Sequence, residues 1–346
     1  MRITLRKFLA LIAAASVFAA PAFAQTATPI TDLQAGADSF SKALGSALPF
    51  NSTLGLNWSD AYIGQLLAVP PHFGVGATMG ATTIKADKAT ALLSKLGFAG
   101  ANALTDLPLP VVTAEARIGG FIIPFDIGVK AMILPQFASD GIKSIVKDLS
   151  LDYTIFGADF RYALLKGGLI MPTISVGVGF NYMKGGMSVK VPSGDTTFSF
   201  TDPSPTSPVA HTVSVTAPTI GLGWETTTLD FKAQISKSLL IVTPYLGLGA
   251  AYGWSKAGYY ITSKVKYDGT ELNDTTLAQL NTMLSALKVN PVKKDGINAM
   301  QDVNGLSLRV YGGASLNLLI LKLDLTGLYN LSDGSYGATV GFRVQL

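Results

Sequence analysis

The segment from Gly305 to Leu346 alternates between apolar and polar side chains with a period of two, in the runs 306–318, 321–331 and 336–346. In the last run, every second residue from Tyr336 onward is apolar, and the residues between are small or polar. Because successive side chains of a strand point to opposite faces, each run predicts an amphipathic strand. A strand of about 12 residues suits a tilted membrane span, which needs roughly 9–11 residues.

The same alternation recurs back to residue 73. The further runs are 73–81, 112–118, 125–133, 156–164, 174–182, 229–235 and 242–252. Short turns near residues 120, 168, 238 and 319 alternate with long connections at about 87–107, 135–147, 191–212 and 269–304. Membrane barrels combine short periplasmic turns with long extracellular loops. The chain therefore predicts an all-β, antiparallel transmembrane β-barrel of about 10 strands, within a range of 8–12.

Helical patterns are confined to the connections and to the N-terminal part. Three stretches inside the long connections read as short helices: 87–104, 138–147 and 277–287. A soluble β-sandwich would share the strand alternation. Three features argue against it: the alternating turn lengths, the Tyr and Phe residues near strand ends, and the absence of charge on the proposed outward face.

The N-terminus has the pattern of a secretory signal. Arg2, Arg6 and Lys7 precede the apolar run 8–18, and Ala22–Ala24 has the A-x-A form of a cleavage site. The apolar run is too short for a membrane-spanning helix of about 20 residues. We therefore predict a signal peptide over residues 1–24, cleavage near Ala24 and localisation to the cell outer membrane.

Residues 25–71 differ from the strand-rich remainder. Thr31 and Asp32 could cap a helix that carries Leu33, Phe40, Leu44 and Leu48. The segment is predicted to extend into the periplasm or to plug the barrel, which then occupies 72–346. If residues 52–65 were also a strand, a partner strand would raise the count to twelve.

Composition adds three constraints. The chain is 48% hydrophobic with a mean hydropathy of +0.38, yet no long apolar run follows the predicted signal. A barrel shows this combination because its apolar residues are dispersed on alternate positions. The chain lacks Cys, so no disulfide stabilises it. Loss of the signal would leave 23 basic against 22 acidic residues, which gives no reason to expect nucleic acid as a partner.

The C-terminal strand resembles that of bacterial outer-membrane β-barrels. In that family the last strand is recognised by the barrel-assembly machinery, which the resemblance implies as a partner together with outer-membrane lipid. The usual last residue is Phe or Trp, whereas this chain ends in Leu346. The stretches Asn57–Gly64 and Pro70–Gly74 resemble an uncharacterised group of spirochaete outer-membrane barrels, a likeness that implies no activity.

If the apolar face of each strand meets lipid, the opposite face lines the lumen and carries the charged side chains. They are Glu115, Arg117, Asp126, Lys130, Asp159, Arg161, Asp230, Lys232, Arg309, Lys322, Asp324 and Arg343. One interpretation is interstrand ion pairing that locks the interior, since buried charges are costly unless paired. The other is a pore eyelet that selects solutes by charge. In so narrow a barrel we favour structural ion pairing. The first group expected to pair is Asp324 with Arg309 and Arg343 on the adjoining strands.

Glycine recurs on the same lumen face, although glycine weakens strands. The positions are Gly74, Gly76, Gly177, Gly179, Gly247, Gly249, Gly313 and Gly341. They could relieve curvature, or they could leave room for a plug or an apolar ligand. The second option, with the high hydropathy, keeps open a channel for hydrophobic substrates similar to the outer-membrane fatty-acid transporters.

No catalytic or cofactor motif is evident. His72 follows two prolines, and His211 lies near Ser207 and Ser214 without a motif that joins them. Metal-ligand spacing and phosphate-binding fingerprints are absent from the sequence. We therefore predict a non-enzyme without cofactor or metal, and favour a passive porin-like channel for small solutes. A non-conducting barrel that serves as an adhesin, receptor or structural anchor is the alternative.

Overall fold

The computed structural model describes residues 30–85, 106–133, 149–190, 196–202, 209–217, 219–262, 264–267, 269–271, 274–275, 278 and 297–346. The predicted signal peptide and the predicted helices at 87–104 and 138–147 lie outside these residues. The predicted helix at 277–287 also does, apart from residue 278.

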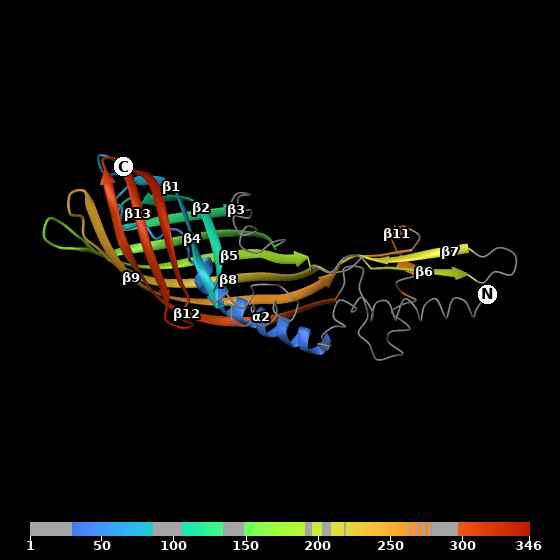
Figure 1. Ribbon diagram of the computed structural model, residues 1–346. Coiled ribbons are helices and arrows are strands. Elements are labelled where there is room, and N and C mark those ends of the chain that lie inside the picture. Colours follow the sequence, from blue (N-terminus) through green and yellow to red (C-terminus); the bar gives the residue numbers. More distant parts are fainter. Residues whose placement is uncertain are drawn as a thin grey trace.

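Ten antiparallel strands close into a barrel, in the order β1-β14-β13-β12-β9-β8-β5-β4-β3-β2 (Figure 1). Their bounds are β1 Phe73–Lys85, β2 Asp106–Gly119, β3 Phe125–Ile133, β4 Leu149–Lys166, β5 Thr173–Lys190, β8 Thr219–Ser236, β9 Val242–Thr262, β12 Ile297–Leu318, β13 Leu321–Asn330 and β14 Tyr336–Gln345. β14 pairs with β1 and so removes every open edge. The predicted ten-stranded barrel is confirmed, and residues 52–65 add no strand to it.

Several strands are longer than predicted. β4, β5 and β8 have 18 residues each, β9 has 21 and β12 has 22. The prediction of a polar loop at 191–212 was partly wrong, because β6 (Thr196–Asp202) and β7 (Val209–Val215) form a hairpin there. Its Thr, Phe and Val residues favour strands. With β10 (Val265–Tyr267) and β11 (Thr270–Glu271) it makes a four-stranded sheet, far from the short turns (Figure 1).

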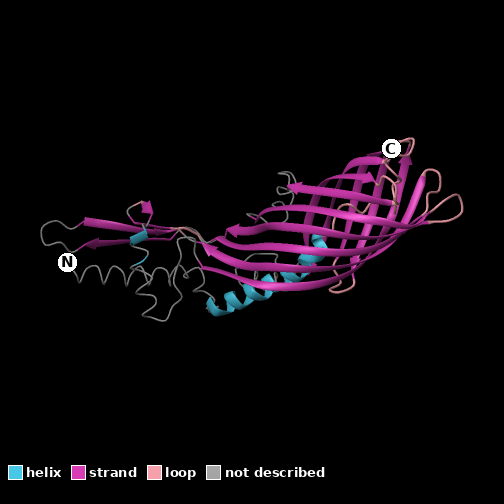
Figure 2. Ribbon diagram, turned by 180° about the vertical axis from the view of Figure 1, so that it is seen from behind, coloured by secondary structure: helices cyan, strands magenta, loops and turns pink. Residues whose placement is uncertain are grey.

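Helix α2 (Ile30–Ser52) enters the barrel at the end opposite the short turns and packs against β8, β9 and β12 (Figure 2). The expected apolar positions Phe40, Leu44 and Leu48 are buried. After Ser52 the chain continues without regular structure through the lumen to about Gly64. Residues 65–72 then lie next to the turn at 121–123 and lead to β1, which begins at Phe73. No helix among the described residues combines the length and hydropathy that a membrane crossing needs.

The two faces of the barrel exchange polarity part of the way along the strands. On β4, Asp159 and Arg161 point into the barrel while Phe160 is exposed, but nearer the long connections Tyr153 is buried while Asp152 is exposed. We call the part next to the short turns the membrane zone and the part next to the long connections the loop zone. The membrane zone comprises 73–81, 112–119, 125–131, 156–166, 173–182, 226–236, 242–255, 305–318, 321–330 and 336–345. The loop zone comprises 82–85, 106–111, 132–133, 149–155, 183–190, 219–225, 256–262 and 297–304.

An aromatic row marks the boundary between the zones on the outer surface. Phe156, Tyr252, Trp254, Tyr329 and Tyr336 are all exposed there. Aromatic side chains gather at the water interface of membrane barrels. The membrane zone therefore has the outer surface of a lipid-embedded barrel, and the loop zone, to which β13 and β14 contribute no residue, has an apolar interior.

Candidate functional site

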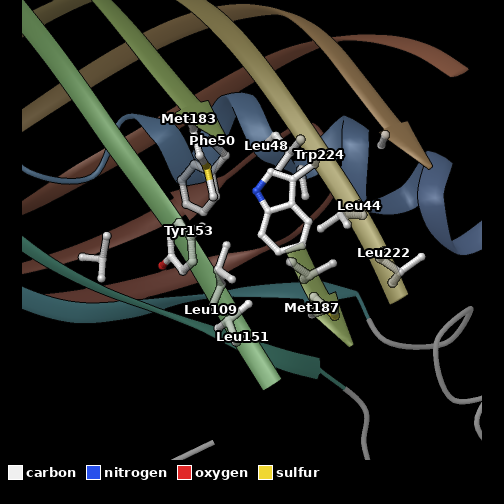
Figure 3. Packing of buried hydrophobic residues seen from close by; sticks show 14 of the residues in the cluster. Leu44, Leu48, Phe50, Leu109, Leu151, Tyr153, Met183, Met187, Leu222 and Trp224 are labelled. Carbon is white, nitrogen blue, oxygen red and sulfur yellow. The ribbon is translucent and has the colours of Figure 1, made fainter. Parts of the chain in front are cut away.

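The lumen of the loop zone is filled by α2. Leu44, Leu48 and Phe50 are completely buried and meet inward side chains such as Met183 and Trp224 (Figure 3). Interiors of this kind are stabilised by about 25 cal/mol for each Å² of apolar surface removed from water. The loop zone therefore has a hydrophobic core made jointly by the helix and the strands.

Two glycines let the helix approach the wall. A Cβ on Gly253 of β9 would lie 2.5 Å from Cγ of Pro49, and a Cβ on Gly45 of α2 would lie 2.8 Å from Cβ of Val303. Both distances are too short for carbon atoms that are not bonded to one another. Small residues at these two places thus fix how deeply α2 sits.

The lumen of the membrane zone holds a buried ion-pair network. Asp126 accepts hydrogen bonds from Arg117 (Nη1 to Oδ1, 2.5 Å) and from Arg161 (Nε to Oδ1, 2.8 Å; Nη2 to Oδ2, 2.9 Å). Asp159 pairs with Arg117 at 2.8 Å and also with Lys232. The side chains of these residues are at most 5% exposed. Buried charges of this density persist only because each carboxylate meets more than one cation.

A second pair differs from the predicted triad. Arg309 makes two parallel bonds to Asp230, from Nη1 to Oδ1 at 2.7 Å and from Nη2 to Oδ2 at 2.8 Å. Asp324 pairs with Arg343, Nη1 to Oδ2, at 3.2 Å. The prediction that Asp324 lies between Arg309 and Arg343 was therefore wrong for Arg309. Register explains the difference, because Asp324 faces Ser315 across the β12–β13 ladder and Arg309 faces Asn330.

Glycine allows these pairs to form across an intervening strand. Arg117 on β2 and Asp159 on β4 are both register partners of Gly128 on β3. A Cβ there would lie 2.5 Å from Oδ1 of Asp159 and 2.7 Å from Nη2 of Arg117. Arg309 likewise crosses β9 at Gly249, where a Cβ would lie 2.5 Å from its Cζ. Because these glycines have no side chain, the arginine side chains can cross the strand and reach the carboxylate on the next one.

The chain after α2, residues 53–64, is here called the plug segment. Trp58 lies between two guanidinium groups, with Cζ of Arg117 at 5.5 Å and Cζ of Arg343 at 4.7 Å from its ring centroid. Its Nε1 donates to Oε2 of Glu115 at 2.7 Å. The ring also lies over Gly74, whose Cβ would approach it to 3.0 Å. Cation–π contacts of this kind are strongest where water is excluded.

Asp60 is the acidic group that the plug segment adds to the lumen. Its Oδ2 accepts from Lys322 Nζ at 2.6 Å and from Arg343 Nη2 at 2.9 Å. Burial alone would raise the pKa of Asp60, but the charges of Arg343 and Lys322 outweigh it and hold the pKa below its ordinary value. Asp60 is therefore charged at neutral pH and ties the plug segment to β13 and β14.

The backbone of the plug segment is bonded to the wall as well. The donors Ser59 N, Ala61 N and Ile63 N bind Asp324, Ser236 and Asp126, at 3.4, 3.0 and 3.2 Å. The acceptors Leu56 O, Trp58 O and Asp60 O are bound by Arg117, Gln234 and Arg161 at 3.3, 2.8 and 2.8 Å, and Leu54 O is bound by Lys130. Lumen charges thus replace the secondary structure that this segment lacks, as buried backbone groups require.

All twelve charged residues predicted to line the lumen point into it, and Lys322 is the least buried. Their partners in the plug segment, Trp58, Ser59 and Asp60, were missing from the prediction. The stretch Asn57–Gly64 stood out in the sequence only through its family likeness. Two signals could have found them. A polar and aromatic run precedes the first strand, and the predicted lumen residues contain fewer acids than bases, so a further acid was needed.

The predicted absence of catalysis stays a prediction. Nδ1 of His72 lies 3.1 Å from the Leu346 carbonyl oxygen, and His211 lies opposite Phe200 in the β6–β7 hairpin. Within the described part of the chain, no three His, Asp or Glu residues are grouped so that they could hold a metal ion.

A closed barrel with an apolar belt, an aromatic row and a charged interior defines the class of transmembrane β-barrels. The chain belongs to the Lsa36-like family, whose model matches residues 73–346. The narrower likeness to a spirochaete group stays a prediction. No match was found among curated proteins.

Three solved barrels are similar in outline. The outer membrane protease OmpT from Escherichia coli is 10% identical with a TM-score of 0.39, and the match covers 80% of this chain and 97% of that one. The translocator domain of the autotransporter NalP from Neisseria meningitidis is 9% identical with a TM-score of 0.30, covering 89% and 97%. A mutant of the monoaromatic hydrocarbon channel TodX is 7% identical with a TM-score of 0.23, covering 79% and 89%.

Proposed function

We propose that this protein is a closed, non-conducting outer-membrane barrel that anchors the loop zone and the sheet β11-β10-β7-β6 outside the membrane. One observation carries the proposal: α2 and the plug segment fill the lumen and bond to the wall along their length. The sequence favoured a porin-like channel. The filled lumen favours the alternative, a barrel whose outward part serves as a receptor, adhesin or structural anchor.

The location follows from the membrane zone. Its outer surface is apolar from the aromatic row to the short turns, and its polar groups face inward, as in outer-membrane barrels. Export through the signal peptide predicted at residues 1–24, and insertion by the barrel-assembly machinery, are part of the same proposal.

A route for hydrophobic substrates is less well supported. The lumen of the loop zone is apolar, as such a route would need, but Leu44, Leu48 and Phe50 of α2 occupy it. An apolar ligand would have to displace these side chains, each of which is fully buried.

Conductance tests the proposal. The mature protein, folded in a planar phospholipid bilayer, is expected to give no current steps. Stable single-channel steps from the unaltered protein would contradict the closed barrel. Gel mobility that changes on heating would verify folding of the same sample before the recording.

A charge-reversed variant provides the positive control. Asp60→Arg places a cation beside Arg343 and Lys322, so repulsion should release the plug segment and produce steps. Asp38→Arg makes the same charge change on α2, away from those cations, and is expected to remain silent.

A further inference from the structure

The short turns at one end of the barrel carry bare apolar side chains. Each contains three consecutive apolar residues, at 121–123, 169–171, 239–241 and 318–320. Leu169 is 98% exposed, Leu240 95% and Leu319 98%. Turns facing water are ordinarily built from Gly, Pro, Asn, Asp and Ser. We call these four triplets the apolar turn surface.

Two of these leucines are in a backbone conformation that disfavours them. Leu240 has φ 55° and Leu319 has φ 58°, in the left-handed region. Gly or Asn would adopt it at a lower energy. Since neither side chain is packed against the protein, the fold gives no reason for leucine at these positions. The side chains have another use.

The backbone of these turns is hydrogen-bonded internally. Lys237 Nζ donates to the carbonyls of Gly168 and Leu169 at 2.7 Å, and Gln65 Nε2 donates to Ile122 O at 2.5 Å. Further carbonyls accept from backbone N–H groups: Ile123, Met171, Leu239, Ile241 and Ile320, at 2.9, 3.0, 3.0, 2.7 and 2.8 Å. Pairing of these carbonyls lowers the cost of placing the turns where water is absent, as in a bilayer.

The length of the apolar belt points the same way. On β5 the outward apolar residues run from Tyr182 at the aromatic row to Ile174 next to the turn. About eight residues, at about 3.3 Å each and a tilt of about 40°, cover about 20 Å of the membrane normal. A hydrocarbon core is about 25–30 Å thick. The strands therefore end before the core does, and the turns lie at its far boundary.

We propose that the apolar turn surface is buried in the phospholipid leaflet on the turn side, as a direct continuation of the lipid-facing belt. The charge next to one turn fits this partner, since the exposed Lys166 precedes the turn at 169–171, and none of the four turn sequences contains a carboxylate. Cationic side chains at such a boundary reach the anionic headgroups. The inference is independent of the proposed function, because a conducting barrel could have the same turns.

The turn at the opposite end gives the contrast. Residues 332–335 are Ser-Asp-Gly-Ser, with the left-handed position taken by Gly334 at φ 73°. Asp333 Oδ1 accepts from Ser335 N at 2.8 Å, as in an ordinary water-facing turn. Short turns at the two ends of the barrel thus differ in composition: the turn at 332–335 is polar, and the four at the other end are apolar.

Fluorescence quenching tests the proposal, and the absence of native Cys makes labelling simple. Leu240→Cys and Leu319→Cys, each labelled with bimane, would be folded into vesicles of phosphatidylethanolamine and phosphatidylglycerol. Phe231→Cys on the belt is the lipid reference, and Ser332→Cys is the water reference. Iodide on both sides of the membrane and doxyl groups on the lipid chains are the quenchers.

Both turn labels are expected to behave like the Phe231 reference. Iodide quenching should be at least about fivefold weaker than at Ser332, because ions are excluded from hydrocarbon, and doxyl lipids should quench strongly. Iodide quenching equal to that at Ser332 would overturn the proposal. Protection from both quenchers would also overturn it, because a second copy of the protein would then cover the turns.

A double substitution gives an independent sign. Leu240→Gly with Leu319→Gly relieves the left-handed backbone and removes two leucines. If the turns lie in lipid, the urea midpoint of unfolding in the same vesicles falls, since the lost burial outweighs the relieved strain. A rise in the midpoint would place the turns in water and contradict the proposal.

Discussion

The membrane zone contains all ten strands and the loop zone contains the far parts of eight of them, all except β13 and β14, yet the two zones solve opposite problems. In the membrane zone the outside meets lipid, so charge goes inward and is neutralised by ion pairs and by the plug segment. In the loop zone the outside meets water, so apolar side chains go inward and are covered by α2. The segment inside the lumen changes from the apolar helix α2 to the polar plug segment where the inward side chains of the strands change from apolar to charged. Each part of residues 40–64 therefore matches the zone that surrounds it.

The largest expected effect lies in the membrane zone. Asp126→Ala would leave both Arg117 and Arg161 without their shared carboxylate, and breaking a buried ion pair costs about 3–5 kcal/mol. Urea unfolding in phospholipid vesicles would measure the loss. A change below about 1 kcal/mol, the usual value for a surface pair, would contradict the network as a stabilising lock.

A somewhat smaller loss is expected in the loop zone. Leu48→Ala removes a fully buried side chain of α2, and such truncations cost about 2–5 kcal/mol through lost burial and the cavity left behind. The same unfolding measurement applies. If α2 left the lumen in solution, the substitution would act on an exposed side chain, and the midpoint would not move.

Asp60→Asn should show its effect through pH. The pKa of Asp60 is lowered in the folded protein, so its contribution to stability is present above the ordinary aspartate pKa of 3.8 and is lost as the pH falls through the lowered value. We expect a loss of about 1.5–3 kcal/mol at pH 7, in the range of a hydrogen bond to a charged group, and a smaller difference from the unaltered protein near pH 3. Thermal melts at both pH values would measure this, and a difference that grows on acidification would contradict the sign.

The smallest effect should come from the outside of the loop zone. Glu225 pairs with Lys184 at 3.6 Å, with both side chains largely exposed. Glu225→Ala is the matched control for Asp126→Ala and should change the unfolding free energy by less than about 1 kcal/mol. If Glu225→Ala cost as much stability as Asp126→Ala, burial in the lumen would not be what makes the Asp126 carboxylate important.

Much of the membrane zone could be predicted from the sequence, because lipid outside and charge inside give a clear alternation. The ten strands and the inward position of residues such as Asp126 and Arg309 follow from that pattern. Pairing did not follow, since Arg309 reaches Asp230 only by crossing β9 at Gly249. Alternation predicts which face of a strand a side chain is on. It does not predict which partner a long side chain such as arginine will reach across a neighbouring strand.

The loop zone was less predictable, because its polarity is reversed. Tyr153 and Ile155 continue the alternation of β4 on the face that carries Asp159 and Arg161 further along. Alternation alone does not tell which face is inside once the strand leaves the membrane. The high mean hydropathy of the chain was the one sequence signal of an apolar interior. In the structure, the apolar side chains beyond those of the lipid-facing belt lie in the lumen of the loop zone and in the short turns.

Cross-linking tests whether residues 40–64 fill the lumen. Ser52 Oγ of α2 donates to Thr228 Oγ1 of β8 at 3.0 Å, and the chain has no other Cys to interfere. In the membrane-inserted protein, the Ser52→Cys, Thr228→Cys double variant should form a disulfide under mild oxidation, whereas Ser46→Cys, Thr228→Cys should not. If both thiols of the first pair stayed free and reacted with a maleimide, the helix would lie outside the lumen and the account would be contradicted.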